Sequence, residues 1–584
     1  MKKSDLALMV AALLMGVGFF AVIPRLWPLS DLPLDTPHRT LEAMSREHQS
    51  ALDMDLSHHV SSASLTLDEP ALSWLERDRG QKQAMTLLEN LPIYLHEIQF
   101  KRRNDPTVAT FWIHPRQGLF GWRRTMEDDE PGGSLDSSAA ARLVSKEVRD
   151  HLGVELSGWE LRRWERKRLQ DRTDHVFVFE RAMESGSDAR LRLSASVSGT
   201  LVREVRQILV TPPAFLREQR RNGFTEQFVQ TFAFTMFASL GVAAFLFKLW
   251  GLRRGLVGLR VPAIGAGVVV ASLAISRVLR SGRLFELWDP LSPQWMSVVK
   301  VLLQGSINDM LAALMVFSFL GAADALDREA PRHRGIALRN FLRLRWIHLD
   351  VGHASIRGYL LGWVAGGVLA LATWLLTTTV PGSLVEIQPR GFFFYGINSS
   401  LPTLLLGFYF LQIAMVEELG YRHFAGNAIL RLGGGRWLAV LLPALIYGAV
   451  HSGLDFLPPA EPWWTRILPI TLVGVLWGLA FLKWDALTVL FSHWACDLFL
   501  FNRTRLFSED PWVRLSAVLC LALPLTPAFV SIGWNLWKQW RAPSAPEEES
   551  WNDDSDFSGF DPGTEPELPV QPNPDTDDPE GRSR

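Results

Sequence analysis

Long apolar segments recur along this chain, and they constrain its fold more than any other feature. A helix needs about 20 mostly apolar residues to cross the hydrocarbon core of a bilayer. The first such segment, residues 6–23, carries no charge and follows Lys2 and Lys3. It is followed by bulky residues rather than by a small-residue cleavage site, so we expect an uncleaved anchor instead of a signal peptide. Further spans are expected near residues 227–248, 256–276, 300–323, 357–380, 400–418, 437–452, 466–482, 485–502 and 512–535.

Residues 28–222 contain no apolar run of membrane length, so we expect them to fold as a soluble domain. Two stretches have helical patterning, 41–57 and 140–157, and each is followed by segments that alternate as strands do. The strand signals lie at residues 109–122, 175–180 and 190–210. The pattern predicts an α+β domain of two repeats, which loosely resembles PepSY modules. The fold class is therefore an all-α polytopic membrane bundle, of about 8–10 transmembrane helices, with an inserted α+β domain.

The distribution of arginine and lysine predicts the orientation of the chain in the membrane. Basic residues are concentrated in cytoplasmic loops. The loops after the second and fourth spans and the segment after the last span are basic, which places both termini in the cytoplasm and residues 28–222 outside it. Arg277, Arg280 and Arg283 fall on the opposite side. The net charge of −2 gives no indication of nucleic-acid binding. We expect an integral protein of the cytoplasmic membrane whose partners are the bilayer and a membrane-protein or peptide substrate.

Ionisable side chains inside membrane spans are costly, so each is a functional candidate. Three clusters stand in consecutive apolar segments: Glu417, Glu418 and Arg422; Tyr447 and His451; His493 and Asp497. Residues four apart share one face of a helix, so each cluster can present a polar face. Glu417 lies about 100° around the helix from Glu418 and can point toward another span.

One glutamate and two histidines that meet in a dry interior are sufficient for hydrolysis. A buried glutamate can act as general base toward water, and a histidine can orient that water or protonate a leaving amine. A second histidine can donate to the oxyanion. The same three side chains, Glu417, His451 and His493, are also a common zinc set, and their spacing does not decide between the two possibilities.

The ordered motifs resemble the CPBP family, which comprises the intramembrane endopeptidases of the CAAX prenyl protease 2 and bacteriocin-processing (Abi) type. The resemblance covers residues 400–502 and rests on EExxxR, aromatic-xxxH and HxxxN/D in that order. It implies that Glu417 and His451 activate water, that Glu418 and Arg422 brace the site, and that His493 and Asp497 stabilise the oxyanion. The family has been described both as metalloproteases and as metal-independent glutamate proteases. We favour the second and predict no cofactor, with zinc as the alternative.

This chain departs from the family pattern at three positions. Tyr447 stands where phenylalanine is usual, His423 follows the arginine where glycine is usual, and Asp497 replaces the commoner asparagine. An ionised aspartate accepts hydrogen bonds only, whereas asparagine is a neutral donor and acceptor. Asp497 can therefore pair with His493 and set its tautomer.

The predicted function is an endopeptidase acting on membrane-associated proteins. The alternatives are a non-catalytic scaffold or chaperone of the same fold and an ion-coupled transporter. For the inserted domain, we weigh a role in gating or recruiting substrates against a passive one. The expected parts are an anchor (1–27), the extracytoplasmic domain (28–222), helices of unassigned role (223–395), the protease core (396–540) and a disordered acidic tail (541–584).

Overall fold

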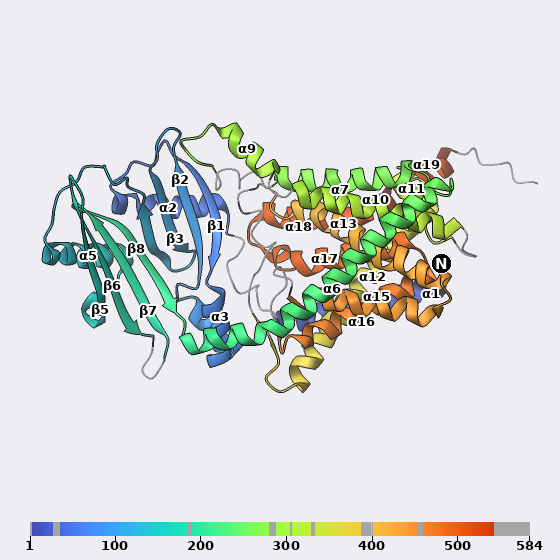
Figure 1. The fold of residues 1–584 in the computed structure, drawn as a ribbon, viewed down its shortest axis with the longest axis horizontal. Helices are drawn as coiled ribbons and strands as arrows, with labels where there is room; N and C mark the ends of the chain where they lie inside the picture. Colours follow the sequence, from blue (N-terminus) through green and yellow to red (C-terminus); the bar gives the residue numbers. More distant parts are fainter. Residues whose placement is uncertain are drawn as a thin grey trace, which may run out of the picture. The chain divides into compact units, whose positions relative to one another are not determined.

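The computed structural model describes residues 3–26, 36–183, 188–279, 288–303, 306–328, 333–386, 397, 399, 401–453 and 460–541. The chain divides into two compact units, Met1–Asn535 and Leu536–Arg584. The first unit holds a β-sheet domain and an array of long apolar helices (Figure 1). Nearly all of the expected acidic tail, residues 542–584, lies outside the described residues.

The N-terminal domain is built on one antiparallel sheet of eight strands in the order β1-β2-β3-β4-β8-β7-β6-β5. The first four strands are β1 (Val60–Leu67), β2 (Tyr94–Lys101), β3 (Val108–His114) and β4 (Gly118–Arg124). The last four are β5 (Glu160–Arg168), β6 (Thr173–Ala182), β7 (Arg190–Ser198) and β8 (Leu201–Val210). Helix α2 (His38–Glu47) precedes the first four and helix α5 (Ser137–Leu152) the last four, so a helix followed by four strands occurs twice. The likeness of these halves to PepSY modules stays a prediction.

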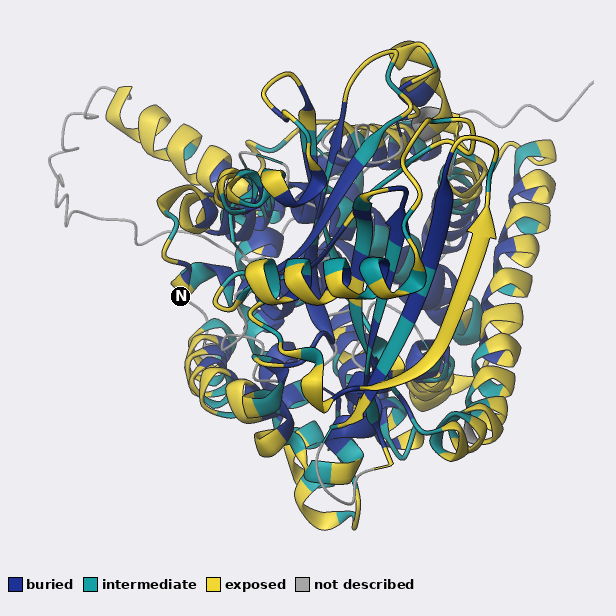
Figure 2. Ribbon diagram, turned by 90° about the vertical axis from the view of Figure 1, so that its left-hand side faces the viewer, coloured by how far each residue is buried: buried dark blue, intermediate teal, exposed yellow. Residues whose placement is uncertain are grey.

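A glycine turn joins two strands of this sheet, and one of its edge strands is highly charged. Gly199 joins β7 to β8 with a φ of 61°, a left-handed conformation that glycine adopts without steric cost. Strand β5 is exposed along its whole length at one edge of the sheet (Figure 2). Its sequence ELRRWERKR is mostly charged, which discourages pairing with another chain.

The sequence located part of this domain correctly. The predicted strand–turn–strand at 109–122 and the strands at 175–180 and 190–210 are confirmed as β3–β4, β6 and β7–β8. The helix expected over 41–57 was wrong in its extent, because α2 ends at Glu47 and a short 3-10 turn, Gln49–Leu52, follows. Helices α3 (Glu69–Arg79) and α4 (Gln81–Leu88), inserted between β1 and β2, were not predicted.

Eight helices in the described residues are long and apolar enough to cross a membrane, and Ala486–Asn502 is a shorter apolar helix. This confirms the predicted helical membrane array; on which side of the membrane the sheet domain lies stays a prediction. The helices before the motifs are α1 (Lys3–Leu26), α6 (Pro213–Arg253), α7 (Arg260–Leu279), α9 (Gln294–Leu303), α10 (Ser306–Arg328), α11 (Ile336–Leu342) and α12 (Leu349–Thr379). The later ones are α13 (Leu404–Glu418), α14 (Asn427–Arg431), α15 (Gly435–Val450), α16 (Trp464–Lys483), α17 (Ala486–Asn502), α18 (Pro511–Ala522) and α19 (Thr526–Arg541).

Glycines let helix α12 approach two neighbours closely. A Cβ on Gly358 would lie 2.5 Å from Cβ of Phe491, and one on Gly362 would lie 2.8 Å from Cβ of Ala495, both on α17. A Cβ on Gly367 of α12 would lie 2.6 Å from Cβ of Met15, which belongs to α1. Small residues at such spacing are typical of helix pairs in membranes, where close backbone packing replaces the hydrophobic effect. Helix α12 thereby ties the N-terminal helix to the helix that carries His493 and Asp497.

A short two-stranded ribbon connects the sheet domain with the helices. Strand β9 (Leu384–Val385) follows α12 and pairs with β10 (Ala460–Glu461), which precedes α16. Helix α3 holds this ribbon: Arg77 forms an ion pair with Glu461, and Ser73 Oγ donates to Oε2 of the buried Glu386 at 2.7 Å. The Gln81 side chain donates to the carbonyl oxygen of Val385 at 3.1 Å.

Candidate active site

Glu417 and Glu418 end helix α13, and the chain then continues as a π-helix from Leu419 to Gly426. This wider turn is uncommon in proteins and occurs preferentially at functional sites. All eight residues of the π-helix are buried. Arg422 lies within this π-helix and Glu418 directly precedes it, and both side chains are buried.

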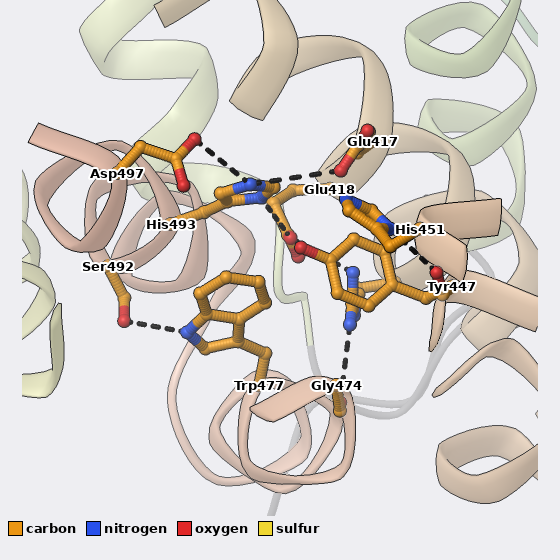
Figure 3. A network of polar contacts seen from close by, with 10 residues as sticks. Glu417, Glu418, Tyr447, His451, Gly474, Trp477, Ser492, His493 and Asp497 are labelled. Carbon is orange, nitrogen blue, oxygen red and sulfur yellow. Dashed lines mark hydrogen bonds and ion pairs between the residues drawn. The ribbon is translucent and has the colours of Figure 1, made fainter. Parts of the chain in front are cut away.

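Glu418 is the centre of a buried charged network. Its Oε1 accepts a hydrogen bond from Nη1 of Arg422 at 2.9 Å. The same oxygen lies 2.7 Å from Nδ1 of His493 (Figure 3). The three side chains are only 2–3% exposed. Arg422 also donates to the carbonyl oxygen of Gly474 on α16 at 3.3 Å. The predicted pairing of Glu418 with Arg422 is confirmed, and Glu418 in addition orients the His493 ring.

The other ring nitrogen of His493 faces the remaining carboxylates. Its Nε2 lies 3.4 Å from Oδ2 of Asp497 and 3.7 Å from Oε2 of Glu417 (Figure 3). Glu417 and Glu418 thus approach the same imidazole from opposite nitrogens, as neighbouring residues on different faces of one helix can. The predicted contact of His493 with Asp497 is confirmed.

His451 stands at the end of α15, in a single 3-10 turn from His451 to Gly453. Its Nδ1 lies 2.7 Å from the carbonyl oxygen of Tyr447, an acceptor, so Nδ1 carries the proton and Nε2 is left as an acceptor. Arg466 on α16 holds the turn itself, since its Nη1 donates to the carbonyl oxygens of Ser452 at 2.8 Å and His451 at 3.3 Å.

Aromatic rings enclose the two histidines. The indole of Trp477 stacks on the His493 ring, with centroids 4.4 Å apart, and its Nε1 donates to Oγ of Ser492 at 2.8 Å. The ring of Tyr447 lies 4.4 Å from that of His451 and 5.9 Å from that of His493. These contacts limit rotation of both imidazoles and keep the surroundings apolar.

A cavity of ≈ 60 Å³ adjoins this cluster. Tyr447, His451, His493 and Asp497 line it together with mostly apolar side chains. Glu417 does not line the cavity itself, but it contacts His493, which does. Within the described residues, Glu417 Oε2, Glu418 Oε2 and the hydroxyl of Tyr421 are buried and form no hydrogen bond. Buried polar atoms without partners are costly, so their gathering here indicates a place for water or substrate.

Residues 398–499 match the model of the family described as type II CAAX prenyl endopeptidase Rce1-like. The match confirms the resemblance inferred from the motifs, and all three motifs lie within it. Comparisons with curated proteins and with solved structures gave no match. We call residues 398–499 the Rce1-like segment.

The placement of possible metal ligands bears on the zinc alternative. In the described part of the chain, no group of three or more His, Cys, Asp or Glu side chains is placed to hold a metal ion. Whether this chain uses zinc stays a prediction, and the mechanism proposed for it is written without a metal.

Two side chains of the site were missed in the sequence. Arg466 is a charged residue inside an apolar span, a signal that singles out functional positions and that would have found it. Trp477 gave no comparable signal, because tryptophan is frequent in this chain. Cys496 and Cys520 are free and buried.

Proposed function

We propose that this chain is an intramembrane endopeptidase that hydrolyses peptide bonds of membrane-associated proteins. The observation that carries the proposal is the meeting of Glu417, His451 and His493, from three separate helices, beside a small apolar cavity in the Rce1-like segment. The family implies proteolysis in a membrane. We do not carry its prenylated substrates over to this chain, because no residue described above selects for a prenyl group.

In the proposed first step, water attacks the carbonyl carbon of the scissile peptide. Glu417 takes a proton from the water, and the acceptor nitrogen Nε2 of His451 orients it. The C–N bond then breaks, and the proton held by Glu417 passes to the leaving nitrogen. A positioned acid–base group contributes about 10²–10⁴-fold to the rate of such a reaction.

His493 is assigned to the oxyanion. As an imidazolium, His493 carries a proton on each ring nitrogen. Its Nδ1–H donates to Glu418, and its Nε2–H donates to the oxygen that becomes negative in the tetrahedral intermediate. Asp497 and Glu417 lie next to Nε2 and provide counter-charge for the cation. Glu418 and Arg422 hold the ring in place and are positioning residues.

The test is cleavage of a membrane-peptide library by purified protein in detergent, followed by comparison of membrane-proteome N-termini in cells with and without active protein. We expect a loss of at least about 10²-fold in three variants that still accumulate as folded protein. They are Glu417→Gln, His451→Ala and His493→Ala. Full activity of any one variant removes that residue from the mechanism. A wild-type protein that cleaves nothing in either experiment would favour the scaffold or transporter alternatives.

We also propose that both termini are cytoplasmic and that residues 28–222 are extracytoplasmic. The basic loops support this orientation. Arg277, one of the arginines that counts against it, forms an ion pair with Asp309 on α10. A reporter inserted after Arg181 tests the orientation, and activity of a reporter that functions only in the cytoplasm would refute it.

A further inference from the structure

A second cavity lies beside the catalytic one and is not part of the mechanism above. It has a volume of ≈ 90 Å³. Its walls come from α1, α12, α16, α17 and the β9–β10 ribbon, and most of the side chains are apolar, including Ile23, Leu26 and Ala370. A cavity of this order with a mostly apolar wall can accept an apolar group; an apolar cavity of about 150 Å³ holds a benzene molecule.

The two cavities share walls. Leu369 on α12, Ile470 on α16 and Leu500 on α17 line both of them. A substrate with its scissile bond at His451 and His493 therefore has the second cavity within a few side-chain atoms of the reacting carbonyl.

Arg466 connects the second cavity to the catalytic turn in another way. Its side chain lines this cavity, and its guanidinium holds the carbonyl oxygens of His451 and Ser452. One side chain, Arg466, thus forms part of the cavity wall and also holds the backbone of the water-orienting histidine. An occupant of the cavity packs directly against the group that fixes the catalytic geometry.

From this continuity we propose that the second cavity is a specificity subsite, which takes one large aliphatic or aromatic side chain of the substrate next to the scissile bond. This inference rests on the proposed endopeptidase function. Helices α1 and α12 supply much of the wall, and both lie outside the Rce1-like segment. The selection is therefore a property of this chain beyond the matched segment.

The test fills the cavity without touching the catalytic groups. Thr373 lines it, and its Oγ1 donates to the carbonyl oxygen of Leu369, as a helical threonine commonly does. We compare Thr373→Phe with the matched control Thr378→Phe, at an exposed threonine of the same helix that makes the same kind of bond to Trp374. The substrates are peptides that differ only in having alanine or leucine at one position flanking the scissile bond.

We expect wild type and Thr378→Phe to prefer leucine over alanine by at least about tenfold in kcat/KM at one flanking position, since one methylene in an apolar pocket is worth roughly 10–200-fold. In Thr373→Phe this preference should disappear while the alanine peptide is still cleaved. The enlarging variant Leu26→Ala should shift the preference toward phenylalanine, which keeps the test decisive if Thr373→Phe fails to fold. Unchanged preferences in the folded variants would overturn the proposal.

Binding can be measured apart from catalysis, so that failure of the subsite and failure of the proposed enzyme are distinguishable. Glu417→Gln protein is irradiated with a peptide that carries photoactivatable leucine at the flanking position. Crosslinks to α1 or α12 at Leu26, Ala370 or Thr373 support the subsite even if no peptide is cleaved. Crosslinks confined to exposed positions, or a cavity that captures only a photoactivatable lipid chain, would refute it.

Discussion

The close contact of α12 with α17 gives a sharp prediction for Gly362→Ala. The new Cβ would lie 2.8 Å from Cβ of Ala495 and 3.0 Å from the carbonyl oxygen of Ser492. Carbon atoms in favourable contact are about 3.5–4.0 Å apart, so α17 must move by about 0.7–1.2 Å. These obstacles are backbone atoms and a Cβ, which no rotamer change can move away.

Stability and activity should respond differently to this shift. Overpacking costs about 1–3 kcal/mol, and replacing glycine by alanine in a helix returns about 0.5–1 kcal/mol, so the net loss of stability is about 0–2.5 kcal/mol. Catalysis is more sensitive, since His493 follows Ser492 and a shift of α17 would displace its ring from the 2.7 Å contact with Glu418. A displacement of about 1 Å can lower a rate by about 10²-fold.

The control is Gly366→Ala on the same helix, where the added Cβ would meet only the ring of Phe19 at 3.4 Å. Both variants are measured by thermal unfolding in detergent and by kcat/KM on a cleaved peptide. We expect Gly366→Ala to match or exceed wild type in stability and to keep its activity. If Gly362→Ala is as active as Gly366→Ala, the rigid packing of α12 on α17 does not position His493, and the reasoning fails.

Three further predictions follow from the site and the sheet domain. Glu418→Gln should lower the folded yield and reduce the free energy of unfolding by roughly 3–5 kcal/mol, because Arg422 would lose its buried counter-charge; normal stability in denaturant titration would contradict this. Activity should survive chelators, and purified protein should carry no stoichiometric zinc by elemental analysis; zinc lost in parallel with activity would instead make Glu417, His451 and His493 its ligands. In the sheet domain, burial lowers the pKa of His96 from 6.5 to about 3, with a smaller effect of the nearby His114. The unfolded chain then binds a proton that the folded one does not, so stability is full above pH 6.5 and falls by up to ~2.7 kcal/mol by pH 4.5. His96→Phe should flatten this dependence in thermal unfolding between pH 7 and 4.5, and an unchanged slope would assign the acid sensitivity to other groups.

Local rules predicted the elements of the site more completely than its connections. The four-residue spacing correctly paired Glu418 with Arg422 and His493 with Asp497, because residues four apart lie about one helical turn apart. The contact of Glu418 with His493 spans 75 residues, and no periodicity in one segment can specify it. The π-helix after Glu418 could not be predicted either, because its sequence, LGYRHFAG, contains no signal that distinguishes a π-helix from an α-helix.

The same limit applies to the fold. Alternating residues located the hairpins of the sheet, whereas the join of its two halves, β4 against β8, depends on three long-range residue pairs. The glycines of α12 that contact α17 tightly, Gly358 and Gly362, lie four residues apart in the sequence. Their spacing indicates a packing face but does not identify α17 as the neighbour.

The ribbon held by α3 has a consequence for how such a protein can change over evolution. Glu386 and Glu461 belong to loops between membrane helices, while Ser73 and Arg77 belong to the inserted domain. A mutation that reverses one of these charges leaves a carboxylate or a guanidinium without its partner, so a compensating change must follow in the other part of the chain. We therefore expect the inserted domain and the ribbon to be inherited together, with positions 77 and 461 varying as a pair. Recombination that exchanged the inserted domain for an unrelated one would expose the buried Glu386. It would also remove the contacts that hold the ribbon, whose residues Val385 and Ala460 line the second cavity.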